Sequence, residues 1–504
     1  MRVLISILLF NQLIFSANIL SNCIVAPDTR TFERFQFTFP EQIESEHFIV
    51  HFTTSNADSQ FVNEQWLNLQ CNFGYAQSVI ELAEYALAIF MEADWEMMPP
   101  DCDEGITDEE SPNHCNNFGG NALYDIYLAN DAVGLVAPEN PYPVEPYIGG
   151  FTSFMQVTPL GNEHTFVPDW SVHVIAHELH HAIQIRYGTS VSGEPGNYAY
   201  NGWLYEQTST YMENVIFPAS YHFLVMMGNC NITSPLTYPE ISIDSSVDIY
   251  QYRSALWQKF LVEAYGDSTI NRLIWEGFGL ETATGNPVNM FPIYESALQT
   301  VTDGVTTLGD AYQDYALWRY FTGSRSRPGE FFMQAASYCT ANLLAIEETP
   351  TTFPSEKGGA RLVKLLPYET NLLLASSAYD NLLVQHISFS EEDEILMSSI
   401  EVNGEESFFQ LYNPAGDNHA LLITSEYTAE PGEEIEFTLA NTVPFMEGDI
   451  TGDSMVNVQD IIVQINIILH QIDPTDYQWL AADLDENNVV DVLDVILLVN
   501  LILG

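Results

Sequence analysis

Hydrophobic and polar positions follow three different patterns along the chain, and each pattern predicts a different kind of domain. Before residue 160, strand-like runs surround one long amphipathic helix at 75–94, and the expected strands cover 47–53, 123–129 and 151–158. From residue 169 the apolar positions follow helical spacing, and helices are expected at 169–187, 202–214, 253–264, 268–278 and 310–322. We therefore predict one α+β domain over residues 18–345, in which Asp169 caps the first of these helices and Gly188 ends it.

The pattern changes near Pro350, where short apolar runs begin to alternate with turn residues. Strands are expected at 361–366, 382–388, 408–412, 420–424 and 434–439. This spacing predicts an all-β sandwich over residues 346–444, either a binding or spacer module or a folding partner of the first domain. In residues 445–504 an acidic loop followed by an apolar helix occurs twice, 34 residues apart, which predicts a third, small α-helical domain. The fold class is thus multidomain.

The first residues have the pattern of an export signal. Arg2 precedes an apolar run that ends at Phe15, and two small residues follow, so residues 1–17 are predicted to be a signal peptide. The run is shorter than the ~20 residues that span a membrane, and no later segment is apolar enough to do so. The mature chain is expected to be secreted and extracellular. Attachment at the cell surface through a lipid on Cys23 stays open, although Asn22 is an unusual residue before a lipidated cysteine.

Export places the chain in an oxidising compartment, where its six cysteines can form disulfides. Cys102 and Cys115 flank an acidic, loop-like stretch and are the best candidate pair. The pairing of the other four stays open, and none has the close spacing of cysteine zinc ligands.

The chain is extremely acidic. Its 69 Asp and Glu residues against 13 Lys and Arg residues give a formal net charge of −56. Such a surface repels phosphate backbones, so we expect no nucleic-acid partner, and it disfavours binding to anionic membrane surfaces for the same reason. It favours divalent cations, although solubility in a salty or calcium-rich medium explains the same bias more simply.

The motif His177-Glu178-Leu179-His180-His181 carries the main chemical signal. Residues four apart lie on one face of a helix, so His177 and His181 can direct two imidazoles at one zinc ion. Glu178 then lies beside the ion and can take a proton from the attacking water. Catalytic zinc usually has three protein ligands, and Glu206, on the next expected helix, is the predicted third.

Three segments resemble known zinc metallopeptidases. The segments AHELHHAIQ at 176–184 and WLYEQTSTYME at 203–213 resemble the gluzincin group and, more closely, a family of secreted bacterial metallopeptidases, which the segment GNALYDIY at 120–127 also fits. The resemblance covers about residues 45–280 and implies a zincin-like fold, zinc at His177, His181 and Glu206, and Glu178 as the base. Thermolysin-like enzymes often have an Asp four residues after the glutamate ligand. Here that residue is Thr210, so another group must orient His177.

Several nearby residues have two interpretations. Tyr252 is the candidate donor to the transition-state oxyanion, followed by Tyr250 and Arg253, but a packed aromatic residue is the commoner role. Glu213 lies on the same helix face as Glu206, where it either orients a ligand or is a solvated carboxylate. The other histidines of the helix are His173, either exposed, beside the ligands or an additional metal ligand, and His180, expected to pack or to face solvent.

Each C-terminal loop offers oxygen ligands at positions 1, 3, 5, 9 and 12 of a 12-residue frame, as calcium requires. The second loop offers the stronger site, because Thr451 in the first is a weaker ligand than Asp. Position 6 is Ser454 in one loop and Asn488 in the other, where glycine is usual. The first set of ligands is Asp449, Thr451, Asp453, Asn457 and Asp460, and the second is Asp483, Asp485, Asn487, Asp491 and Asp494.

Two such loops followed by one helix each resemble a type I dockerin. The resemblance implies one or two structural Ca²⁺ ions and a cohesin-like scaffold protein as partner. A calcium-stabilised cap, a sorting tag or a pair of solvated acidic turns are the alternatives.

Together these patterns predict a secreted zinc metalloendopeptidase that hydrolyses peptide bonds in extracellular proteins or peptides. An aminopeptidase is the nearest alternative, but no motif that would hold a substrate amine is evident. The other alternative is a catalytically inactive binding protein on the same fold, assembled through its dockerin-like module. The intact Glu178 argues against it.

Overall fold

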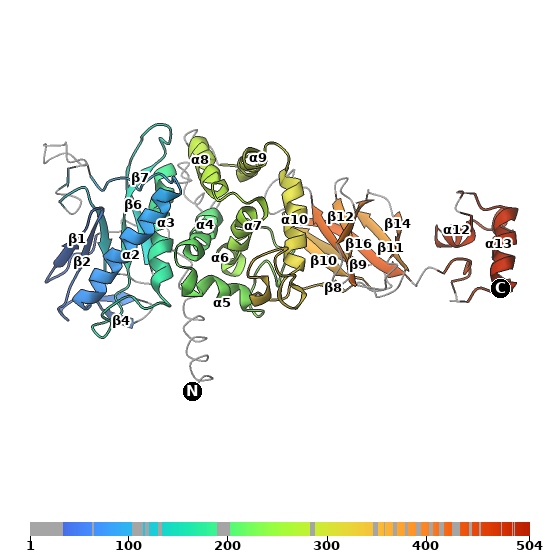
Figure 1. The fold of residues 1–504 in the computed structure, drawn as a ribbon, viewed down its shortest axis with the longest axis horizontal. Helices are drawn as coiled ribbons and strands as arrows, with labels where there is room; N and C mark the ends of the chain where they lie inside the picture. The colour runs from blue at the N-terminus through green and yellow to red at the C-terminus, as the bar shows by residue number, and fades with distance from the viewer. Residues whose placement is uncertain are drawn as a thin grey trace. The chain divides into compact units, whose positions relative to one another are not determined.

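The computed structural model describes residues 34–503, drawn as a ribbon in Figure 1, and the chain divides into two compact units. The residues it leaves undescribed within this range are 63–64, 103–113, 116–119, 130–133, 189–201, 283–287, 346–350, 357, 366–369, 378–381, 390–394, 403–406, 413–417, 426–433, 443–445, 453–454, 475, 486 and 488. The predicted signal peptide, Cys23 and Asp453 therefore lie outside the described residues. The first unit comprises the chain up to Thr237 with Ile243–Ala311 and Phe321–Thr340, and the second comprises Tyr238–Ser242, Tyr312–Tyr320 and Ala341–Gly504.

The first unit begins with a five-stranded sheet of order β1-β2-β5-β7-β6. Its central strands β2, β5 and β7 are parallel, and the two edge strands are antiparallel to their neighbours. The strands are β1 (Glu41–Glu44), β2 (Phe48–Phe52), β5 (Tyr124–Tyr127), β6 (Gly134–Pro141) and β7 (Phe151–Val157). A separate hairpin pairs β3 (Ser59–Val62) with β4 (Gln65–Asn68).

Two helices lie against this sheet, α2 (Phe73–Glu92) on β2 and α3 (Val172–Tyr187) on β6 and β7 (Figure 1). The buried face of α2 includes Val79, Ala83 and Leu87, which are spaced as the sequence predicts. The remaining helices of the unit follow α3: α4 (Gly202–Ile216), α5 (His222–Gly228), α6 (Tyr250–Arg253), α7 (Ala255–Tyr265), α8 (Ile270–Thr282) and α9 (Met290–Val301). Helix α10 (Leu308–Tyr320) runs from the first unit into the second.

Two disulfides join segments of the first unit. The predicted pair Cys102–Cys115 is confirmed, and Cys230 pairs with Cys339, which lies 109 residues further along the chain. Cys71 is buried and free.

The second unit contains two sheets. The five-stranded sheet has the order β13-β12-β15-β10-β8 and the four-stranded sheet the order β14-β11-β16-β9, with all pairs antiparallel except β8 and β10. Val363, Val384 and Leu421 belong to the core of the first of these sheets, and Phe353 of the other sheet packs against it. The strands are β8 (Leu344–Ala345), β9 (Thr351–Glu356), β10 (Ala360–Lys364), β11 (Thr370–Ser377), β12 (Leu382–Phe389), β13 (Leu396–Val402), β14 (Ser407–Tyr412), β15 (Asn418–Ser425) and β16 (Glu434–Thr442).

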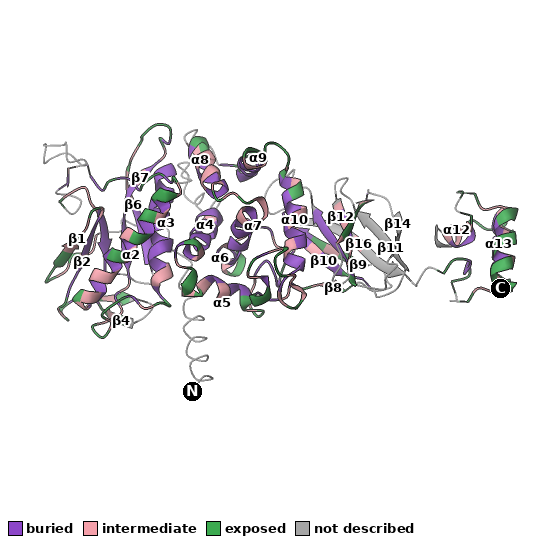
Figure 2. Cartoon of the chain, in the orientation of Figure 1, coloured by how far each residue is buried: buried purple, intermediate pink, exposed green. Residues whose placement is uncertain are grey.

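The C-terminal repeat forms α11 (Val458–Ile468), α12 (Asp476–Ala482) and α13 (Val492–Leu503). Ile450, Ile467 and Leu498 form a small core with Ala481 and Ala482. Figure 2 shows that much of α13 is exposed. The domain boundary predicted between residues 444 and 445 stays a prediction.

The structure corrects the start of the helix that carries the histidines. It begins at Val172 after Ser171, and not after Asp169, so the predicted cap at Asp169 is wrong. Pro168 and Trp170 lie in a turn, where the Ser171 N–H donates to the carbonyl of Pro168, and this turn displaces the helix start. The predicted end at Gly188 is confirmed, with φ at 147°. Among the described residues, no helix combines the length and the apolar composition needed to cross a membrane.

Candidate metal centre

Helix α3 is enclosed by protein along almost its whole length. Every residue from Val174 to Tyr187 is buried, because the sheet, α2, α4 and α8 all pack against this helix. Such enclosure is unusual for a helix that carries four histidines and a glutamate, since buried polar side chains need partners. The partners come mainly from α4.

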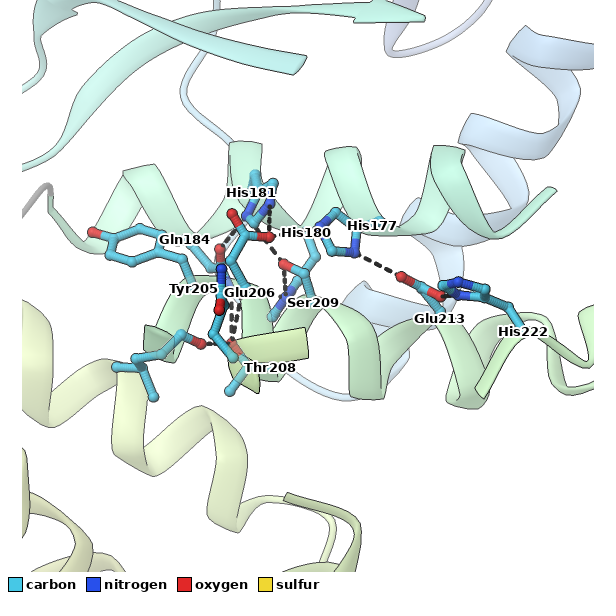
Figure 3. Close-up of polar contacts among 12 residues, drawn as sticks. His177, His180, His181, Gln184, Tyr205, Glu206, Thr208, Ser209, Glu213 and His222 are labelled. Atoms are coloured by element: carbon cyan, nitrogen blue, oxygen red, sulfur yellow. Dashed lines mark hydrogen bonds and ion pairs between the residues drawn. The ribbon is translucent and has the colours of Figure 1, made fainter. Parts of the chain in front are cut away.

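Helix α4 brings Glu206 to the two motif histidines (Figure 3). Its Oε2 atom lies 3.1 Å from Nε2 of His177 and 3.4 Å from Nε2 of His181. Two ligand atoms on one tetrahedral zinc ion lie ~3.3 Å apart when each is 2.0–2.1 Å from the metal. The donor atoms of all three residues lie within 4.8 Å of one another. The spacing therefore fits a single small cation.

The Nδ1 atoms of His177 and His181 are both hydrogen-bonded, and this determines the protonation of their Nε2 atoms. Nδ1 of His177 contacts Oε1 of Glu213 at 2.7 Å, and Nδ1 of His181 contacts Oε1 of Gln184 at 2.7 Å. Because these oxygens accept, each Nδ1 carries the proton, and a neutral ring presents an Nε2 lone pair toward Glu206. Two lone pairs and a carboxylate facing one point attract a cation.

Electrostatics favour the same protonation states. Burial would raise the pKa of the Glu206 carboxyl, but in acid, where the histidines are protonated, the charge on His181 and the hydrogen bond from His177 outweigh it and hold this pKa at about 2. Burial lowers the pKa of His181 below its ordinary value of 6.5. At neutral pH the site combines an ionised carboxylate with a neutral His181 imidazole, as a divalent metal requires.

Glu178 lies one residue after His177 and is 2% exposed. Gly134, the first residue of edge strand β6, approaches it so closely that a Cβ at position 134 would lie 2.7 Å from Cδ of Glu178. The edge strand therefore meets the helix at the predicted catalytic carboxylate, and glycine permits this close approach.

Glu213 orients His177 in place of the missing Asp at position 210. Its Oε2 atom also accepts a hydrogen bond from Nδ1 of His222, at 2.5 Å. Burial would raise the pKa of Glu213, but the charges on His222 and His173 and the hydrogen bond from His177 hold it well below its usual range. Of the two interpretations of Glu213, the solvated carboxylate is wrong. His222 was not anticipated from sequence, because it lies on a separate short helix.

The other two histidines of α3 pack against aromatic rings. His180 is fully buried and stacks on Phe90 with ring centroids 5.2 Å apart, so it packs and does not face solvent. His173 stacks on His222, and burial together with that neighbour lowers its pKa to about 3.

Tyr252 lies beside the candidate metal ligands. Its ring stacks on that of His177 with centroids 5.9 Å apart, and the residue is 2% exposed. This contact suits a packed aromatic residue, and its role as an oxyanion donor stays a prediction. Tyr250 is fully buried, and Arg253 donates through one guanidinium nitrogen to the carbonyls of Thr233 and Asp248.

The second C-terminal loop gathers three carboxylates. Ligand oxygens of Asp483, Asp485 and Asp494 lie within 4.8 Å of one another, and Asp494 is fully buried. Asp494 accepts hydrogen bonds from the N–H groups of Leu484, Asp485 and Asp491. Asp491 caps α13 by accepting from the N–H of Leu493. Three carboxylates this close repel one another, and a bound cation would offset the repulsion.

The first loop repeats the hydrogen bonds of the second. Asp449 and Asp460 are fully buried, and Asp460 accepts from the N–H groups of Thr451 and Asn457. Asn457 caps α11 through the N–H of Gln459, just as Asp491 caps α13. The two copies therefore share one design.

Two histidines and one glutamate on adjacent helices thus define a candidate metal centre, with a second glutamate at its side. Residues 165–294 match the model of a family described as a family of unknown function, DUF6055. The match covers about a quarter of the chain, and it includes the helices that carry His177, Glu178, His181 and Glu206. No curated protein is similar enough to this chain to be matched.

Proposed function

We propose that this protein is a secreted zinc metalloendopeptidase that cleaves peptide bonds in extracellular proteins or peptides. The observation that carries the proposal is the convergence of His177, His181 and Glu206 at distances that suit one tetrahedral ion. Glu178 on the same helix supplies the base that such an enzyme needs. The resemblance of both motifs to gluzincin metallopeptidases points to the same activity.

A zinc ion at this site would supply a Lewis acid that polarises the scissile carbonyl and lowers the pKa of water. Glu178 accepts a proton from the attacking water and returns it to the nitrogen of the leaving amine. Glu213 and Gln184 hold the two imidazoles with their Nε2 atoms directed inward. Tyr252, stacked on His177, is the candidate donor to the developing oxyanion.

The proposal extends to the fold of each part. A zincin-like fold in the first unit is supported by the packing of α3 against β6 and β7 on one side and α4 on the other. A β-sandwich in the second unit is supported by the contact of Phe353 with the core of the other sheet.

The repeated acidic loops support a dockerin-like module that binds one or two structural Ca²⁺ ions. Its partner would be a cohesin-like scaffold protein. Exposed apolar residues on the two repeat helices support such docking, and they include Val458, Ile462, Val492 and Ile496.

The test measures zinc and hydrolysis separately in Glu178→Gln and Glu206→Gln. We expect the wild type to bind one zinc ion per chain and to hydrolyse casein. Glu178→Gln should keep the zinc and lose activity by about 10²- to 10⁴-fold, because only proton transfer is removed. Glu206→Gln should lose zinc affinity as well. Glu84→Gln, which alters a partly exposed glutamate paired with His47, is the control and should change neither measurement.

Hydrolysis that survives Glu178→Gln would contradict the mechanism in which Glu178 is the base. A wild type that binds zinc without hydrolysing any substrate would instead favour the inactive binding protein. Peptides blocked at the amino end separate an endopeptidase, which still cleaves them, from an aminopeptidase.

A further inference from the structure

The carboxylate of Glu213 is shared by two histidines that come from different helices. Its Oε1 atom accepts from His177 on α3 at 2.7 Å, and its Oε2 atom accepts from His222 on α5 at 2.5 Å (Figure 3). Glu213 is 2% exposed, so bulk water has little access to replace either donor. The bond from His222 therefore fixes the rotation of the same carboxylate that holds the ring of His177.

A second metal ion is another interpretation of this cluster, because donor atoms of His173, Glu213 and His222 lie within 4.8 Å of one another. The ring arrangement opposes it. The rings of His173 and His222 are stacked, with centroids 4.0 Å apart and planes 19° from parallel. A zinc ion binds a ring nitrogen at 2.0–2.1 Å along its in-plane lone pair, so two stacked rings cannot both direct a lone pair at one ion.

We propose that His222 is a positioning residue of the zinc site. Through Glu213 it holds the ring orientation and tautomer of His177, and it thereby raises the zinc affinity without touching the ion. The inference rests on the proposed function, since it requires that His177 binds zinc. Groups that hold a ligand histidine typically contribute 10–100-fold to metal affinity. His222 acts one residue further out, so we expect an effect of about tenfold.

Two substitutions separate the N–H donor of His222 from its ring. His222→Phe keeps a ring that can stack on His173 but removes the donor, whereas His222→Asn keeps an N–H near the position of Nδ1 but removes the ring. Zinc affinity of the full chain is measured by competition with a chromophoric chelator, and Co²⁺ is substituted to record its visible absorption. His47→Phe is the matched control, because Nδ1 of His47 contacts Oε2 of Glu84 at 2.8 Å in a pair away from the metal centre.

We expect His222→Phe to weaken zinc binding about tenfold and to alter the Co²⁺ spectrum, and His222→Asn to restore most of both. His47→Phe should change neither. If His222→Asn weakens zinc binding and His222→Phe does not, His222 only packs and the inference is wrong. Equal zinc affinity in the two variants would also overturn the inference, while leaving the proposed function intact. A wild-type chain that binds no zinc would overturn both.

Discussion

Position 134 leaves no room for a side chain. Gly134 begins edge strand β6, and a Cβ there would collide with the carboxylate of Glu178. Glu178 is only 2% exposed, so its displaced side chain has no direct path into solvent. Replacing Gly134 by alanine, the smallest possible change, should therefore displace Glu178 without moving the candidate metal ligands.

We predict that Gly134→Ala lowers kcat by about 10²-fold, because displacing a catalytic group by about 1 Å has effects of that size. Zinc content should stay at the wild-type level. The matched control is Gly309→Ala on α10, where the added Cβ meets only an ordinary contact at 3.7 Å from Oγ1 of Thr307. Unchanged kcat in Gly134→Ala, with the structure intact, would argue against Glu178 as the base.

The sequence predicted the three residues of the candidate metal centre better than it predicted the residues that hold them in place. His177 and His181 follow from helical spacing alone, and Glu206 follows from the expected second helix. Glu213 was left with two interpretations because spacing places it on a face without saying what that face contacts. His222 gave no signal, since its partner lies nine residues away across a turn between helices.

At the scale of elements, the long periodic segments were predictable and the edge elements were not. The helices expected at 75–94 and 202–214 correspond to α2 and α4. Strand β6 was missed because it contains Pro138 and Pro141, which an edge strand tolerates but which hide the strand pattern. Helix α9 was missed because Pro292 lies in its first turn, although the Asn289 side chain caps it.

Strands β12 and β15 bring two histidines together inside the second unit. Nε2 of His386 lies 3.4 Å from Nδ1 of His419, and burial, followed by the charge on His419, lowers the pKa of His386 to about 4. Between pH 4 and 6.5 the unfolded chain then binds more protons than the folded chain, so stability falls as the pH falls through this window.

We predict that the second unit loses on the order of 2 kcal/mol of unfolding free energy from His386 between pH 6.5 and 4. His386→Gln should remove this part of the pH dependence. Denaturant unfolding across this range measures it, followed by a signal from the sheets. An unchanged slope in the variant would mean that other groups cause the acid sensitivity.

The repeat helices α11 and α13 should depend on calcium. The first repeat contains the fully buried carboxylates of Asp449 and Asp460 and the second that of Asp494, and their charge is costly to bury without a cation. We predict that a calcium chelator exposes the amides of both helices to hydrogen exchange, and that Asp483→Asn weakens calcium binding by at least about tenfold. Asp473→Asn, an exposed residue outside both loops, is the control. Identical exchange with and without calcium would refute the calcium sites.

On the scale of the whole molecule, the excess of acidic residues is the dominant property. A formal net charge of −56 creates a negative potential that extends about 8 Å from the surface at physiological salt. A peptide approaching the protein meets this potential before it makes any contact, so charge should affect the rate of encounter.

We predict that kcat/KM is higher for peptides rich in Lys and Arg than for otherwise identical peptides rich in Asp and Glu. The difference should be about tenfold or more at low salt and should shrink steadily as NaCl rises toward 1 M, because salt screens the field. A preference that does not change with salt would locate the selectivity in specific pocket contacts instead.

The disulfide between Cys230 and Cys339 encloses 108 residues that include helices α6 to α10. Any single cut of the backbone inside that span produces two fragments that remain one covalent molecule. A protein proposed to work among proteases, including other copies of itself, can therefore be cleaved once in this span without releasing a fragment. Its apparent size would reveal the damage only after a reductant opens the bond.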